Sequence, residues 1–190
     1  MMGVIMAGGR ANRLRTGREK GLLKIGGRTL LERAARALEV DGIKERSVAV
    51  TDWTKETAQL ADTLGLSTTR TMGRGYHEDV LELLDSLDKF VSLNVDVPFA
   101  NRSHVERIIA VGREDSLAAV IPRSIALIEP DSESIVRHER LGELVWVGLN
   151  LVTPEPEISF VVYDDPLLSI NVNTKEDLAF AEQVARERSI

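Results

Sequence analysis

The chain has no cysteine among its 190 residues. This absence excludes disulfides, thiolate metal ligands and a cysteine nucleophile, and it is compatible with a reducing cytoplasm, where we expect the protein. Long apolar runs are also missing: no stretch approaches the roughly 20 apolar residues of a membrane span. The start of the chain, MMGVIMAGGR, has no charged leader and too few apolar residues for a signal peptide.

The chain also lacks an overall excess of basic residues. Its formal net charge is −6, which argues against a general nucleic-acid-binding or anionic-membrane surface. Against this acidic background, six basic residues fall within 15 positions near the N-terminus: Arg10, Arg13, Arg15, Arg18, Lys20 and Lys24. A local cluster of this kind indicates a specific anionic ligand.

Apolar runs typical of strands alternate with segments of helical periodicity. The strand-like runs are 4–6, 47–50, 66–69, 90–95, 117–121, 144–152 and 160–163, and the helical segments are 29–40, 54–64, 76–87, 102–112 and 174–187. This alternation predicts an α/β fold with a mostly parallel sheet and helices on both faces. We expect residues 1–190 to form one domain, with the last two strands in a subsidiary hairpin.

Two of the helix starts carry a capping-box sequence. Thr29 precedes Glu32 by three residues, and Thr174 precedes Asp177 in the same way. In a capping box the hydroxyl accepts from the backbone three residues on, and the acidic side chain reaches back to the start of the helix. The sequence therefore predicts helices that begin just after Thr29 and Thr174.

The first predicted strand runs directly into Gly8 and Gly9. Ligands of open α/β sheets bind beyond the carboxyl ends of the strands, and glycines let backbone N–H groups approach phosphate oxygens. The basic side chains that follow could neutralise a triphosphate or pyrophosphate. The segment contains neither a Walker A sequence nor G-x-G-x-x-G, which excludes two common phosphate-binding loops. A solvated basic loop with a glycine turn is the alternative interpretation.

The segment MAGGRANRLRTGREKGLLKIGG resembles the signature of GTP- and sugar-nucleotide transferases, L/M-A-G-G-x-x-x-R-M-G followed by [D/E]-K-[G/P]-L. Molybdenum-cofactor guanylyltransferases share this signature. Four further segments resemble archaeal adenosylcobinamide-phosphate guanylyltransferases of the CobY type: TMGRGYHEDV (71–80), VSLNVDVP (91–98), WVGLNLVTP (146–154) and INVNTKEDLAFAE (170–182). The chain departs from the pattern at Ala11, where a glycine is usual, at Arg13-Leu14-Arg15, which replaces R-M-G, and at Gly21, where proline is common.

The resemblance implies a single Rossmann-like nucleotidyltransferase domain of the GT-A-like kind. It implies transfer of GMP from GTP to adenosylcobinamide phosphate, which gives adenosylcobinamide-GDP and pyrophosphate in cobalamin biosynthesis. A molybdenum-cofactor guanylyltransferase, another MobA-like nucleotidyltransferase and a non-catalytic GTP-binding sensor are the alternatives. The acceptor phosphate needs no general base, because its second pKa is about 6. The sequence leaves the oligomeric state open, and a homodimer is compatible with it.

The resemblance also implies roles for particular residues. Arg13 and Lys20 would bind the triphosphate, Arg10 would hold the leaving pyrophosphate, and Asp96 would bind Mg²⁺ with Asn173 or, as an alternative, Asn171. The remaining nucleotide-binding candidates are Ala7, Gly8, Gly9, Lys24, Thr51, Gly73, Gly75, Tyr76, Glu78 and Asp79.

For several of these residues a structural role is the alternative. Asp96, Asn171 and Asn173 would also suit turns or helix caps. Glu78 or Asp79 would accept hydrogen bonds from guanine, although acidic residues in a first helical turn also favour the helix dipole.

The segment 146–154 lies where the resemblance places the acceptor. Gly148 would make room for a large substrate and Asn150 would hydrogen-bond it. Trp53 and Trp146 are expected to pack in the core, with contact to the acceptor as the alternative. The three histidines show no metal-ligand spacing.

Overall fold

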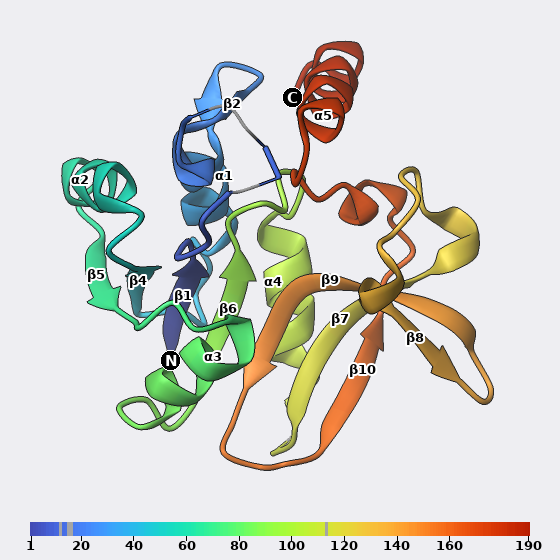
Figure 1. The fold of residues 1–190 in the computed structure, drawn as a ribbon. Helices are drawn as coiled ribbons and strands as arrows, with labels where there is room; N and C mark the ends of the chain where they lie inside the picture. Colours follow the sequence, from blue (N-terminus) through green and yellow to red (C-terminus); the bar gives the residue numbers. More distant parts are fainter. Residues whose placement is uncertain (12, 15–16, 113) are drawn as a thin grey trace.

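The structure, a computed structural model, describes residues 1–11, 13–14, 17–112 and 114–190. Its central sheet has the strand order β10-β7-β9-β6-β1-β4-β5, and β8 pairs with β9 outside this path (Figure 1). The strands are β1 (Met2–Met6), β4 (Glu45–Val50), β5 (Ser67–Arg70), β6 (Phe90–Asn94), β7 (Ser116–Pro122), β8 (Ile135–His138), β9 (Gly142–Val152) and β10 (Ile158–Val162). A separate two-stranded sheet joins β2 (Lys24–Ile25) and β3 (Arg28–Thr29).

The five α-helices of the described residues are α1 (Leu30–Ala37), α2 (Lys55–Thr63), α3 (Tyr76–Leu84), α4 (Arg102–Ala110) and α5 (Lys175–Arg188). Short 3₁₀ helices lie at η1 (Lys20–Leu22), η2 (Arg123–Ile125), η3 (Ser132–Ser134) and η4 (Pro166–Ser169). The predicted alternation is confirmed, as are both capping boxes: Thr29 accepts from the backbone N–H of Glu32 and Thr174 from that of Asp177, and each acidic side chain reaches back.

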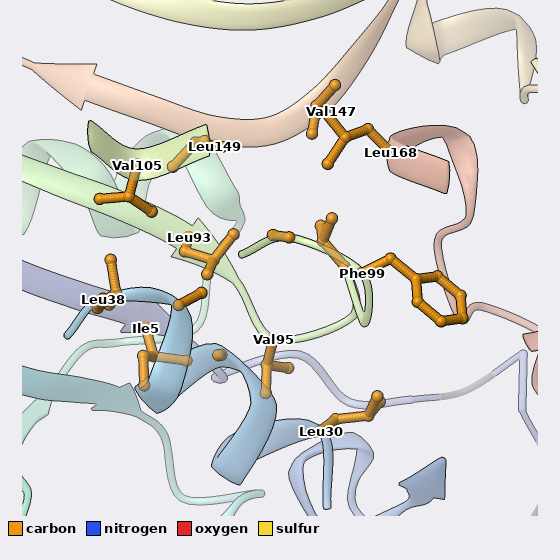
Figure 2. Packing of buried hydrophobic residues seen from close by; sticks show 14 of the residues in the cluster. Ile5, Leu30, Leu38, Leu93, Val95, Phe99, Val105, Val147, Leu149 and Leu168 are labelled. Carbon is orange, nitrogen blue, oxygen red and sulfur yellow. The ribbon is translucent and has the colours of Figure 1, made fainter. Parts of the chain in front are cut away.

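Successive residues of the central strands face opposite sides of the sheet, as strand geometry requires. Ile5 of β1 and Leu93 of β6 point into the large core under α1 and α4, where Figure 2 shows them near Leu38 and Val105. Val4 of β1 lies in a smaller cluster on the other face, against α3. The predicted arrangement of a sheet with helices on both faces is therefore confirmed.

The prediction that the last two strands form a hairpin is wrong. β9 lies between β6 and β7 and is antiparallel to both, whereas β10 pairs in parallel with β7 at the edge of the sheet. The cause lies in the pattern of β9, because Val145, Val147, Leu149 and Leu151 are all buried on its core face. A strand whose core face is apolar from end to end is stable in the middle of a sheet, and the hairpin partner of β9 is β8.

The strands β4, β1 and β6 are parallel neighbours, so their carboxyl ends share one edge of the sheet. Figure 1 shows the segment after β1 and the segment before α5 approaching each other beyond this edge. In the part of the chain that the structure describes, no helix is long and apolar enough to cross a membrane.

Candidate active site

A lysine, an aspartate and an asparagine from three distant parts of the chain meet beyond the carboxyl end of β6. The Lys20 ammonium donates to Asp96 Oδ2 at 2.6 Å and to Asn173 Oδ1 at 2.7 Å. The Lys20–Asp96 pair is largely shielded from solvent, with 15% and 18% of the two side chains exposed. The structure therefore brings together three of the residues that the sequence singled out, with Asn173 rather than Asn171 in the contact to Lys20.

The capping box of α5 fixes the position of Asn173. Asp177 Oδ2 accepts from the backbone N–H of Asn173 at 2.9 Å and from that of Thr174 at 2.8 Å. One residue earlier, the backbone N–H of Val172 donates to the carbonyl of Asp96 at 2.9 Å. The helix cap and this backbone bond together hold the Asn173 amide beside the Asp96 carboxylate.

Two oxygen atoms, one from Asp96 and one from Asn173, converge on a single cation, which in this structure is the Lys20 ammonium. Mg²⁺ prefers oxygen ligands and is commonly held by one or two carboxylates together with waters and substrate phosphates. The donor set therefore fits Mg²⁺ in the presence of a triphosphate. Within the described residues, no group of three or more His, Asp or Glu side chains is placed to hold a metal by itself.

Arg13 lies on the same side of the molecule and pairs with an acidic residue of the later loops. Its Nη1 donates to Asp131 Oδ2 at 2.6 Å, and both side chains are about 60% exposed. The hydrogen bond from Asp131, and the more distant charges of Asp177 and Asp96, raise the pKa of the Arg13 guanidinium. An exposed ion pair contributes little stability, so Arg13 can exchange Asp131 for a phosphate at low cost. Arg15 lies outside the described residues.

The two glycines after β1 have different reasons to be glycine. A Cβ on Gly8 would come within 2.7 Å of the Thr51 methyl, and a Cβ on Gly73 within 2.9 Å of the same methyl. Thr51 is buried and its hydroxyl donates to the Gly8 carbonyl at 3.0 Å, so it joins the two loops. A Cβ on Gly9 would meet nothing within 4 Å. Protein packing therefore accounts for Gly8 and Gly73, whereas Gly9 leaves open space for a ligand.

Arg10 lies across the indole ring of Trp53, with its guanidinium carbon 4.0 Å from the ring centroid. The expectation that Trp53 packs in the core is wrong, because 51% of the residue is exposed. A guanidinium stacked on an indole is held by a cation–π interaction, worth roughly 0.5–1 kcal/mol at an exposed site. Trp53 thus orients Arg10 beside the loop that contains Gly73. Trp146 is half-buried, and its ring packs edge-to-face against Phe160.

The buried side chain of Asp79 hydrogen-bonds the loop before α3. Asp79 is buried and its Oδ1 accepts from the backbone N–H of Gly73 at 3.0 Å. Burial raises the pKa of the Asp79 carboxyl, and the Gly73 N–H opposes that shift. Glu78 is exposed in the first turn of α3, so it is the more accessible of the two carboxylates predicted to bind guanine. Gly75, with φ of 153°, precedes the helix.

A hydrogen-bonded trio connects α3 to β6 and β9. Asn150 Nδ2 donates to Tyr76 Oη at 2.7 Å, and the Tyr76 hydroxyl lies 3.1 Å from Ser92 Oγ. Enclosure of this hydroxyl raises the Tyr76 pKa, although 44% of the residue is exposed. The predicted nucleotide-binding Tyr76 and the predicted acceptor-binding Asn150 are therefore in direct contact.

Two further predicted residues, Gly148 and Lys24, interact with residues outside the Lys20, Asp96 and Asn173 cluster. A Cβ on Gly148, at φ of 89°, would meet Asn94 Nδ2 at 2.7 Å, so the Asn94 side chain fills the room that this glycine leaves. Lys24 is exposed on β2, where its charge acts on Glu32. Direct roles of Gly148 in acceptor binding and of Lys24 in nucleotide binding stay predictions.

The model of the MobA-like NTP transferase domain family matches residues 3–141, which include most of β1, the glycine pair, Lys20 and Asp96. The chain belongs to this family. No curated protein matches the chain. The fold of this MobA-like domain is similar to that of a CMP:2-keto-3-deoxy-manno-octonic acid synthetase complexed with CTP, with a TM-score of 0.68 and 16% identity over 98% of this chain and 99% of the other. It is also similar to 4-diphosphocytidyl-2C-methyl-D-erythritol synthase from Anaerococcus prevotii, with a TM-score of 0.67 and 12% identity over 97% and 95% of the two chains.

Family membership makes the chain a nucleotidyltransferase of the MobA-like kind, and nucleotidyltransferases of this superfamily commonly use a divalent metal. Sequence reasoning missed two residues of this MobA-like site. Trp53 was expected in the core, and the position of Glu19, next to Lys20 in the signature, gave no indication of its contacts with α2.

Proposed function

We propose that the chain transfers GMP from GTP to adenosylcobinamide phosphate, with release of pyrophosphate. A phosphate oxygen of the acceptor attacks the α-phosphorus of GTP, and the bond from this phosphorus to the α–β bridging oxygen breaks. The observation that carries the proposal is the convergence of Lys20, Asp96 and Asn173 beyond the carboxyl end of β6. The family membership supports the transfer of a nucleotide, and the four CobY-like segments support this acceptor.

The chemistry requires cations rather than a base. The acceptor phosphate is already mostly ionised near neutral pH, since its second pKa is about 6. The barrier comes from bringing two polyanions together and from the charge that builds on the leaving pyrophosphate. In this proposal Lys20 and Arg13 bind the triphosphate and Arg10 holds the leaving group. The backbone N–H groups of Gly8 and Gly9 donate to phosphate oxygens.

Asp96 and Asn173 would hold Mg²⁺, which supplies Lewis-acid stabilisation of the reacting phosphate. For these side chains to accept it, Lys20 must move from between them. The ammonium would then face the phosphate oxygens instead of the Asp96 carboxylate, so its charge stays compensated. We therefore assign Lys20 two alternate partners, Asp96 without the nucleotide and a phosphate with it.

Selection of the base falls to the loop around α3 in this proposal. Glu78 would accept from the N1–H and N2–H₂ groups of guanine, while Asp79 holds the loop through Gly73. Tyr76 would close over the nucleotide beside Asn150, which would contact the acceptor. In this proposal the two substrates would lie on either side of the Tyr76–Asn150 contact.

The test is release of pyrophosphate from GTP or CTP with Mg²⁺ and one acceptor at a time. We expect release with GTP and adenosylcobinamide phosphate together, and little with either alone. Release only with molybdopterin would transfer the assignment to molybdenum-cofactor guanylylation. Release only with CTP would overturn the proposed base. Tight GTP binding without turnover on any acceptor would favour the GTP-sensor alternative.

A further inference from the structure

Glu19, the residue before Lys20, reaches across to the N-terminus of α2. Its Oε1 accepts from the backbone N–H of Glu56 at 3.0 Å, and its Oε2 accepts from that of Thr57 at 2.6 Å. These are N–H groups of the first turn of α2, which have no partner within the helix. A carboxylate bonded to two such groups also interacts favourably with the positive end of the helix dipole.

The helix does not supply this cap from its own sequence. Thr54, in the N-cap position, makes no capping hydrogen bond with its side chain. Its hydroxyl instead accepts from the backbone N–H of Thr51 at 2.9 Å, within the turn after β4. The first turn of α2 is therefore capped by Glu19, which lies 37 positions before Glu56 and 38 positions before Thr57 in the chain.

The residue after Lys20 contacts the same turn of α2. A Cβ on Gly21 would lie 2.7 Å from the Thr57 methyl carbon and 2.9 Å from its hydroxyl oxygen, so the backbone of Gly21 packs closely on Thr57. The 3₁₀ turn of η1 is closed by hydrogen bonds from Leu22 to the Glu19 carbonyl and from Leu23 to the Lys20 carbonyl. Lys20 is thus held on both sides, by the Glu19 carboxylate and by the Gly21 contact.

We propose that Glu19 is a positioning residue for nucleotidyl transfer, because it fixes the backbone of Lys20 on α2 so that the ammonium is aimed at Asp96, Asn173 and the triphosphate. Lys20 has a flexible four-carbon stem, which by itself defines no direction. Anchoring its backbone removes much of that freedom before the substrate binds. The inference rests on the proposed role of Lys20 in transfer and goes beyond it, since both carboxylate oxygens of Glu19 bind the backbone of α2.

The kinetic test compares Glu19→Ala with a variant that loses a helix cap elsewhere. Thr29→Ala removes the capping hydroxyl of α1 and is the matched control for lost stability. We expect Glu19→Ala to lower kcat for pyrophosphate release on the order of ten- to a hundredfold, the scale of a displacement of about 1 Å. Thr29→Ala should lose similar thermal stability but keep kcat within about twofold of the wild-type value, a much smaller change than that expected for Glu19→Ala. Glu19→Gln, which retains one acceptor oxygen, should recover part of the kcat.

A double-mutant cycle tests the same inference without activity. If Glu19 positions Lys20, Lys20→Met destabilises the wild-type chain more than it destabilises Glu19→Ala, because the Lys20–Asp96 contact is already weakened there. Chemical unfolding of the four proteins measures this coupling. Additive effects in the cycle, or equal kcat for Glu19→Ala and Thr29→Ala, would overturn the inference. If the wild-type protein turns over no nucleotide at all, the proposed function fails, and the cycle alone decides the role of Glu19.

Discussion

Removing the Lys20 charge should make the nucleotide-free protein bind a divalent cation more tightly. The ammonium lies between the two oxygens proposed to hold Mg²⁺, 2.6 Å from Asp96 and 2.7 Å from Asn173. A metal ion and the ammonium cannot share this position. In Lys20→Met the competing cation is gone, while a side chain of comparable length remains.

The size of the effect follows from Coulomb's law. Even if the displaced ammonium moves to about 6 Å from a divalent ion, the two repel by about 1.4 kcal/mol at the dielectric constant of water. This energy corresponds to about a tenfold change in affinity. The shielding of both side chains lowers the effective dielectric constant, and the lost Lys20–Asp96 bond adds to the cost. We therefore expect a gain of at least about tenfold for Lys20→Met.

Titration with Mn²⁺, followed by electron paramagnetic resonance of the free ion, measures this affinity without any nucleotide. Lys44→Met is the matched control, because it removes the same charge from an exposed position just before β4, at the opposite edge of the sheet. We expect Lys44→Met to bind Mn²⁺ within about twofold of the wild-type affinity, since a screened charge at that distance acts weakly. Equal or weaker Mn²⁺ binding by Lys20→Met would refute the placement of the metal between Asp96 and Asn173.

Three further predictions concern the loops and the helix α4. Gly9→Ala should leave the melting temperature unchanged but weaken nucleotide binding in a fluorescence titration. Gly8→Ala should lower the melting temperature, because the added Cβ meets Thr51. A lower melting temperature for Gly9→Ala would contradict this prediction. Ala11 has φ of 51°, a left-handed conformation that strains a residue with a Cβ in the folded protein. Ala11→Gly relieves this strain, which exceeds the cost of glycine's greater flexibility in the unfolded chain, so the free energy of unfolding should rise by about 0.5–1 kcal/mol. Chemical unfolding measures the sign of this change. Burial lowers the pKa of His104, and its Nδ1 accepts from the Asn101 N–H. The unfolded chain therefore binds this proton more readily, so the melting temperature should fall as the pH drops below about 6.5, and fall less in His104→Gln.

The sequence was sufficient for most of the fold because its patterns are local. Thr29 and Thr174 are followed by their capping partners within three residues, and both caps are present as predicted. Strand pairing is not local, and here the prediction failed for residues 144–152. The apolar periodicity of that segment indicated a strand but gave no information on its neighbours in the sheet.

For the site, the residues could be predicted from the signature segments but their contacts could not. Asp96 and Asn173 were named as partners from the resemblance, and the structure places both on Lys20. Glu19 was missed because a carboxylate that caps a helix 37 residues away looks like any other charge in the sequence. The position of Trp53 was predicted wrongly because the sequence does not distinguish a tryptophan that stacks on an arginine from one that packs in the core.

The most direct test of the Lys20, Asp96 and Asn173 centre is pyrophosphate release by Asp96→Asn compared with its affinity for GTP. The amide can still accept from Lys20 but removes the charge proposed to hold Mg²⁺. We predict that turnover falls on the order of a hundredfold or more, while GTP affinity stays within a few-fold. Turnover close to that of the wild-type protein would contradict the assignment of this cluster as the centre of nucleotidyl transfer.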